Sequence, residues 1–144
     1  MKHVLLLAAF ALALATPAPA QMLKPTQVST AARATFKAKF PLVKTNTWEK
    51  EGDKYEAGFK QNSITMSALI TPAGELVETE SNTSPAKLPA ALRATLARDY
   101  KAYKVTEAAV LVSASGATTY EAEVSQGGKH HDVVFNADGS LVKK

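Results

Sequence analysis

Two segments of the chain carry an apolar side chain at every fourth position, the spacing that gathers such side chains on one side of an α-helix. The two stripes are Val28, Ala32, Phe36 and Phe40, and Leu88, Leu92, Leu96 and Tyr100. Pro41 ends the first helix directly after its stripe, and Pro89 suits the first turn of the second. We therefore predict two helices, each with a single buried stripe.

After each helix the apolar pattern changes to a period of two, which is typical of strands with one buried face. The expected strands are 45–49, 55–59, 64–70 and 76–80 after the first helix, and 105–112, 119–124, 132–135 and 141–142 after the second. Short turn sequences such as Gly127-Gly128 and Asp138-Gly139 separate these strands. The strands should be antiparallel, because parallel strands need long crossover connections.

The two halves of the chain also resemble each other in sequence. Arg-Ala-Thr at 33–35 recurs at 93–95, and Tyr-Glu-Ala at 55–57 recurs at 120–122. We interpret the halves as two tandem repeats, about 24–80 and 84–144, each of one helix plus four antiparallel strands. The predicted fold class is α+β, with the helices packed on one face of a sheet of up to eight strands. Because each helix has only one apolar stripe, we expect the repeats to share one core.

Residues 1–20 have the three parts of a secretory signal peptide. A basic start at Lys2 precedes an apolar run and the small-x-small cleavage site Ala18-Pro19-Ala20. The apolar run is too short for a membrane-spanning helix, which needs about 20 residues. We predict cleavage between Ala20 and Gln21, a single mature domain over 21–144, a periplasmic or secreted location and no membrane anchor after cleavage.

Charge and composition exclude several functions. Without Lys2 the chain has 16 Lys and Arg against 13 Asp and Glu, a net charge of +3, and the two signs are interspersed. So small an excess does not indicate binding to nucleic acid or to an anionic membrane. The absence of Cys excludes thiol catalysis, iron–sulfur clusters and thiolate zinc sites. An exported domain without disulfides must be held together by its core.

The order of structural positions along the chain supports a family resemblance. Its main elements are Phe36-x-x-x-Phe40-Pro41, Trp48, Tyr55-x-Ala57-x-Phe59 and Leu88-Pro89. This order resembles the PepSY-like family of small exported bacterial proteins, which are also described as similar to β-lactamase-inhibitor proteins. The resemblance implies two helix-plus-four-strand repeats, no established catalysis and, by analogy with the inhibitors, protein binding through a concave sheet face. The disulfides of the inhibitors have no counterpart here, and inhibition of a β-lactamase is not implied.

No metal, cofactor or catalytic site is predicted. His130 and His131 are neighbours on an expected strand, where successive side chains point to opposite faces, so they are poorly placed to chelate one ion together. Carboxylates two residues apart on a strand share a face, but acid–base chemistry of the glycosidase kind also needs a deep sugar cleft. On an antiparallel strand, alternating Glu residues are typical of the solvated face.

The sequence therefore favours a non-enzymatic binding module for a protein or peptide, of an inhibitor-like or regulatory kind. Trp is a frequent interface anchor, and alternating acids would give the open sheet face a negative rim. The candidate partner-binding residues on these grounds are Trp48, Glu78, Glu80, Glu121 and Glu123. The alternative is a small-ligand or metal carrier that uses a cavity between the helices and the sheet.

Overall fold

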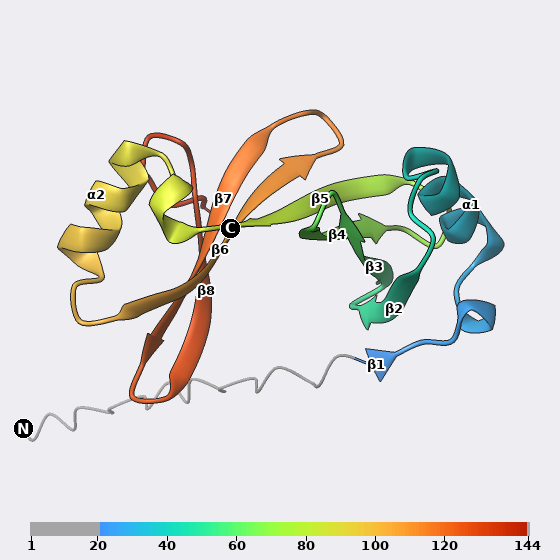
Figure 1. Cartoon of the computed structure of the whole chain (residues 1–144), viewed down its shortest axis with the longest axis horizontal. Helices are drawn as coiled ribbons and strands as arrows, with labels where there is room; N and C mark the ends of the chain where they lie inside the picture. The colour runs from blue at the N-terminus through green and yellow to red at the C-terminus, as the bar shows by residue number, and fades with distance from the viewer. Residues whose placement is uncertain (1–20, 144) are drawn as a thin grey trace, which may run out of the picture.

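The computed structural model describes residues 21–143, and within them the chain forms one antiparallel sheet of eight strands. Each strand pairs with the next along the chain (Figure 1). The strands are β1 (Gln21–Met22), β2 (Asn46–Glu51), β3 (Lys54–Gln61), β4 (Ile64–Ile70), β5 (Leu76–Thr83), β6 (Lys104–Ser113), β7 (Thr118–Gln126) and β8 (Lys129–Phe135). Two helices, α1 (Thr30–Lys39) and α2 (Ala90–Asp99), each follow a short 3-10 turn, Pro25–Gln27 and Pro85–Lys87.

Most of each predicted stripe is buried, and only its last residue, Phe40 or Tyr100, is partly exposed. Ala32 and Phe36 of α1 are buried, as are Leu92 and Leu96 of α2. Helix α1 begins after Ser29, whose hydroxyl oxygen accepts a hydrogen bond from the backbone N–H of Ala32 at 3.1 Å. This bond satisfies one of the backbone donors that every helix leaves free at its N-terminus.

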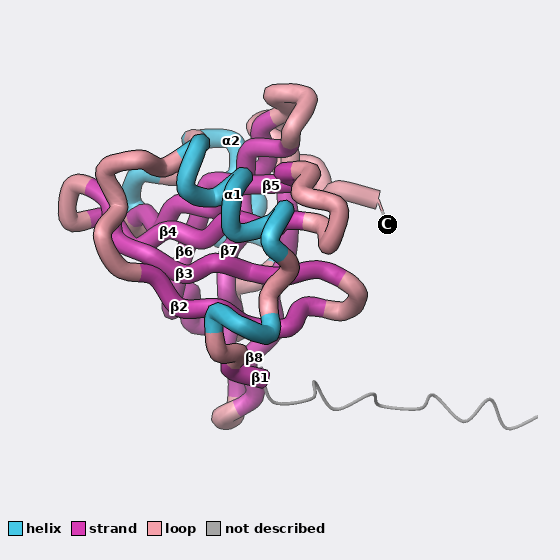
Figure 2. Tube along the Cα trace, turned by 90° about the vertical axis from the view of Figure 1, so that its right-hand side faces the viewer, coloured by secondary structure: helices cyan, strands magenta, loops and turns pink. Residues whose placement is uncertain are grey.

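Helices α1 and α2 lie at opposite ends of the molecule (Figure 1), and α1 covers strands β2 to β4 (Figure 2). The strand register places both helices on the same face of the sheet. Ala68 of β4 lies opposite Ala57 of β3 on one side and Thr79 of β5 on the other, and Thr79 lies opposite Val112 of β6. Ala108 lies on the same side of β6 as Val112, because side chains alternate along a strand. Ala57 and Ala68 belong to the cluster under α1, and Ala108 belongs to the cluster under α2.

The predicted tandem repeats of one helix plus four strands are wrong. Four strands follow α1, but only three follow α2, and the remaining strand, β1, precedes α1. The segment expected as a final strand, 141–142, makes only an isolated bridge between Leu141 and Phe135. Two apolar residues after a turn are too few for a strand ladder, and Gln21–Met22 is too short to show the alternation that marks a strand. The described chain is mainly one continuous sheet with two short helices.

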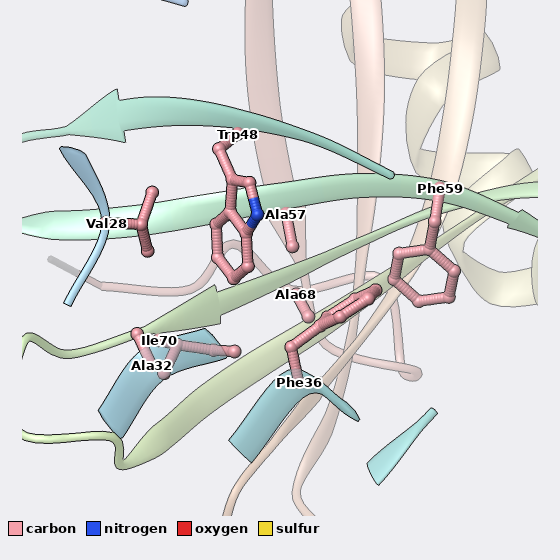
Figure 3. Close-up of a cluster of buried hydrophobic side chains, with 8 residues drawn as sticks. All are labelled: Val28, Ala32, Phe36, Trp48, Ala57, Phe59, Ala68 and Ile70. Atoms are coloured by element: carbon pink, nitrogen blue, oxygen red, sulfur yellow. The ribbon is translucent and has the colours of Figure 1, made fainter. Parts of the chain in front are cut away.

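The hydrophobic core is divided into two clusters, contrary to the expectation of one shared core. The cluster under α1, drawn in Figure 3, consists of Val28, Ala32, Phe36, Trp48, Ala57, Phe59, Ala68 and Ile70. The cluster under α2 consists of Leu88, Leu92, Leu96, Ala108, Ala122, Val124 and Phe135. Strand β5 has no buried residue. Its helix-side positions Thr79 and Ser81 are polar, so they interrupt the apolar surface between the clusters.

Two turns fix the helices to the sheet. In the turn after β4, the carbonyl oxygen of Gly74 accepts a hydrogen bond of 2.6 Å from the hydroxyl of Thr35 in α1. The turn after β8 approaches α2 so closely that a Cβ atom on Gly139 would lie 2.7 Å from the carbonyl oxygen of Ala91. Gly139 also has a φ of +82°, a conformation that glycine adopts without steric cost.

Candidate functional site on the helix-free sheet face

The sheet face opposite the helices is rich in carboxylates, and we call it the acidic face. Strand alternation and register place on it Glu49, Glu56, Glu78, Glu80, Glu107, Glu121, Glu123 and Asp132. The whole chain has 13 Asp and Glu, so more than half of its acids lie on this one face. Because the chain as a whole has a net charge of +4, the acidic character of this face does not reflect the composition of the whole protein.

Three hollows follow one another across the strands, the first at the ends of β2 and β3 and the other two on the acidic face. The first, of about 610 Å³, lies where the loop after α1 meets β2 and β3, and its lining includes Leu42, Val43 and Phe59. The second, of about 290 Å³, shares Thr47, Gly58 and Thr65 with the first. The third, of about 30 Å³, shares Glu80 and Asn82 with the second. We call the three hollows together the groove.

The chemical lining changes along the groove. The first hollow combines apolar side chains with Lys44 and Lys60. The carboxylates that line the second and third are Glu49, Glu56, Glu80, Glu107, Glu121, Glu123 and Asp132. Among residues 21–143, no Lys, Arg or His lines either of these two hollows. The groove is thus apolar and basic at one end and acidic over the rest.

Several of these carboxyls have perturbed pKa values. Burial raises the pKa of Glu121 to about 7, with further contributions from the neighbouring charges of Asp132, Glu80 and Glu78. Burial also raises the pKa of Glu80, followed by the charges of Glu56 and Glu78, and burial alone raises that of Glu78. The ionised forms are unfavourable because half-buried like charges lie together. Such perturbed groups are enriched at functional sites.

Glu123 lies at the rim of the third hollow and is stabilised in its ionised form. Its Oε1 accepts a hydrogen bond from the Thr106 hydroxyl and lies 3.0 Å from Nδ1 of His130. These two hydrogen bonds lower the pKa of Glu123. The ring of His131, by contrast, meets that of Tyr103 on the helix side, with the ring centroids 5.3 Å apart. In the described part of the chain, no group of three or more His, Cys, Asp and Glu could hold a metal ion.

The structure brings together four of the five residues that the sequence suggests for partner binding. Glu78, Glu80, Glu121 and Glu123 all lie on the acidic face. Trp48 lies on the opposite face, where it is 4% exposed and packs edge-on against Phe36 with ring centroids 5.5 Å apart (Figure 3). Trp48 is therefore a core residue, and the prediction that it contacts a partner is wrong.

Sequence reasoning missed four other acids on the acidic face, Glu49, Glu56, Glu107 and Asp132. Glu56 could have been found, because it stands between two residues, Tyr55 and Ala57, that face the helices. Asp132 lies directly opposite Glu123 in the register. Like charges in that position destabilise a sheet, so a sequence pattern gives no reason to expect the pair.

Two further hollows lie beside the helices, where the alternative prediction of a small-ligand carrier would need its cavity. One, of about 330 Å³ beside α1, is lined in part by Arg33 and Lys37. The other, of about 460 Å³ beside α2, is lined in part by Arg93 and Tyr103. Nε of Arg93 donates a hydrogen bond of 3.1 Å to the carbonyl oxygen of Leu88, so this side chain already has a structural role. Both hollows are open to solvent.

The predictions of a signal peptide and of the absence of a membrane anchor concern residues inside and outside the described range. The predicted signal peptide, including Ala20, lies outside them, whereas Gln21 is the first residue of β1. No helix within residues 21–143 is long and apolar enough to cross a membrane.

No family model and no curated protein matches the sequence. Solved structures do match. A candidate periplasmic protein from Bacteroides eggerthii superimposes with a TM-score of 0.72 at 16% identity, over 81% of this chain and 86% of that one. A DUF2874 family protein from Bacteroides uniformis gives 0.71 at 15% identity, over 81% and 87%. A BLIP-like protein from Bacteroides fragilis gives 0.64 at 23% identity, over 81% and 84%. The likeness to β-lactamase-inhibitor-like proteins is confirmed as a likeness of fold.

Proposed function

We propose that this chain is a non-enzymatic, extracytoplasmic binding module that presents its helix-free sheet face to a protein partner. The observation that carries the proposal is the groove, which crosses the sheet as three hollows that share lining residues. Half-buried carboxylates line its acidic part, and among residues 21–143 only Glu123 of this lining forms an ion pair, with His130. Such an arrangement opposes folding, because it desolvates like charges. A partner that neutralises these charges would offset the repulsion between them, which favours a binding role for this face.

The fold neighbours support the same proposal. One is named as a candidate periplasmic protein and another as BLIP-like. The predicted signal peptide agrees with an extracytoplasmic location, and the residue spacing agrees with membership of the PepSY-like family. We propose that membership as well, with binding through the open sheet face as the shared property of these proteins.

A pull-down with a blocked face tests the proposal. Ser67 of β4 lines the second hollow, so Ser67→Tyr fills it without changing the charge of the protein. Ala38→Tyr places the same side chain on an exposed position of α1, away from the groove, and serves as the matched control. We expect Ala38→Tyr and the wild type to retain the same proteins from an extract of the source cells, and Ser67→Tyr to lose them. Capture that Ser67→Tyr leaves unchanged would contradict the proposal.

A further inference from the structure

Resting on the proposed function, we infer that the groove binds an extended basic segment of the partner protein, laid across the strands. The segment places an apolar residue in the first hollow, a Lys or Arg side chain in the second, and another with its charged end over the small third hollow. Its occupant is therefore a basic polypeptide that also carries an apolar anchor.

Charge complementarity identifies the basic part of the occupant. Glu80 lies between the second and third hollows and lines both, and Glu121 and Asp132 line the third. A carboxylate accepts short, charge-assisted hydrogen bonds from Lys, and the guanidinium fork of Arg can bind its two oxygens at once. Because Glu80 and Glu121 are half-buried, a cation placed between them is poorly screened by solvent and pairs more strongly than at an exposed site.

The opposite end of the groove calls for an apolar side chain. Leu42 is 84% exposed, and it lines the first hollow together with Val43 and Phe59. Lys44 and Lys60 also line this hollow, so a basic residue of the occupant would be repelled there. The occupant must therefore have a direction, with its apolar residue over β2 and β3 and its basic residues over β5 to β7.

The spacing between the two ends follows from sheet geometry. Neighbouring strands lie about 4.8 Å apart, so four steps, from the β2–β3 edge to the β6–β7 region, span about 19 Å. An extended chain advances about 3.3 Å per residue. The apolar residue and the basic residue over the third hollow are accordingly about six positions apart, and the basic residue of the second hollow lies between them.

Gly58 contributes no side chain to the groove where the first and second hollows meet. It is an interior residue of β3, it lines the first and second hollows, and its φ is not among the positive values that require glycine. The missing side chain also makes space for Thr47, whose Oγ1 would lie 2.8 Å from a Cβ atom at position 58. A glycine inside a strand often marks the close approach of another backbone.

Selection from a phage-displayed library of random octapeptides on the immobilised protein tests the inference. We expect the selected peptides to carry two or more Lys or Arg, with an apolar residue about six positions from one of them. Fluorescence anisotropy with labelled synthetic copies then measures binding to two variants that add the same charge. Asn82→Arg puts a cation at the exposed position where the second and third hollows join, and Ala38→Arg puts one on α1.

The expected result is at least a tenfold loss of affinity for Asn82→Arg and a change of less than twofold for Ala38→Arg. Selection that yields no binder, peptides without basic enrichment, or equal losses in the two variants would each overturn the inference. The selected peptides could instead be non-basic and still fail to bind Ser67→Tyr. That result would overturn only the inference and leave the proposed function standing. Thermal unfolding of each variant, followed by circular dichroism, confirms that the fold is retained.

Discussion

Replacing Glu121 by Gln tests whether the acidic face lowers the stability of the protein. The substitution keeps the size of the side chain and removes its charge. In the wild type, burial and the charges of Asp132, Glu80 and Glu78 raise the pKa of Glu121 from 4.5 to about 7. Between these two values the folded protein holds a proton that the unfolded chain has released.

The sign of the pH effect follows from proton linkage. Where the folded state binds more protons than the unfolded state, the free energy of unfolding falls as pH rises. This contribution is therefore lost between about pH 4.5 and 7 and is constant above that range. A pKa difference from 4.5 to 7 corresponds to an upper limit of about 3 kcal/mol. Solvent screening of a half-buried carboxyl reduces the expected effect to about 1–2 kcal/mol.

Urea titrations at pH 5 and pH 8 measure the effect. Trp48 is the only Trp and is buried, so its fluorescence reports unfolding. At pH 5 the variant Glu121→Gln should exceed the wild type by much less than at pH 8, because Glu121 is still protonated in the folded protein and only part of its contribution has been lost. At pH 8 the variant should be more stable by about 1–2 kcal/mol.

An exposed acid supplies the control for this comparison. Glu75 lies in the turn after β4 and is exposed, so Glu75→Gln should change stability equally at both pH values. Two outcomes refute the reasoning about the acidic face. One is a Glu121→Gln variant no more stable than the wild type at pH 8, and the other is an equal gain at pH 5 and pH 8.

Three further predictions concern the helix contacts, the divided core and the groove. Gly116→Ala should cost about 1 kcal/mol of unfolding free energy, and Gly139→Ala at least about 2 kcal/mol. Both glycines have a positive φ, but only Gly139 abuts Ala91. Equal losses in urea titrations would argue against a tight contact between the turn and the helix. The losses of unfolding free energy caused by Phe36→Leu and Leu92→Val should add to within about 0.5 kcal/mol in the double variant, because the two residues lie in separate clusters. A departure from additivity above about 1 kcal/mol would indicate one core. A selected basic peptide should bind several-fold more tightly at pH 8 than at pH 5.5, because Glu121, with a pKa of about 7, ionises in between; anisotropy titrations that show equal affinities would contradict this coupling.

Local pattern was sufficient to predict much of the sheet and both helices. Most of each apolar stripe of the helices is buried, and the expected strand 64–70 coincides with β4. Alternation along single strands also placed Glu78 with Glu80, and Glu121 with Glu123, on common faces. These features depend only on residues close in sequence, where helix and strand periodicities act directly.

The remaining features depend on how the strands align across the sheet. The side of β2 that carries Trp48 becomes clear only when β2 is registered against β3, where Trp48 lies opposite the buried Ala57. The division of the core depends on Thr79, which lies on the helix side of β5 between Ala68 and Val112. The groove arises from residues of several strands, and no single segment of the sequence contains it.

Mapping by nuclear magnetic resonance tests the central claim, that the helix-free face is the binding surface. Amide ¹H–¹⁵N spectra of the protein would be recorded during titration with the tightest-binding peptide from the display selection. We expect the largest shifts at residues that line the groove, such as Thr47, Gly58, Ser67 and Asn82. Largest shifts on α1 or α2, with the amides of the groove unchanged, would contradict the claim.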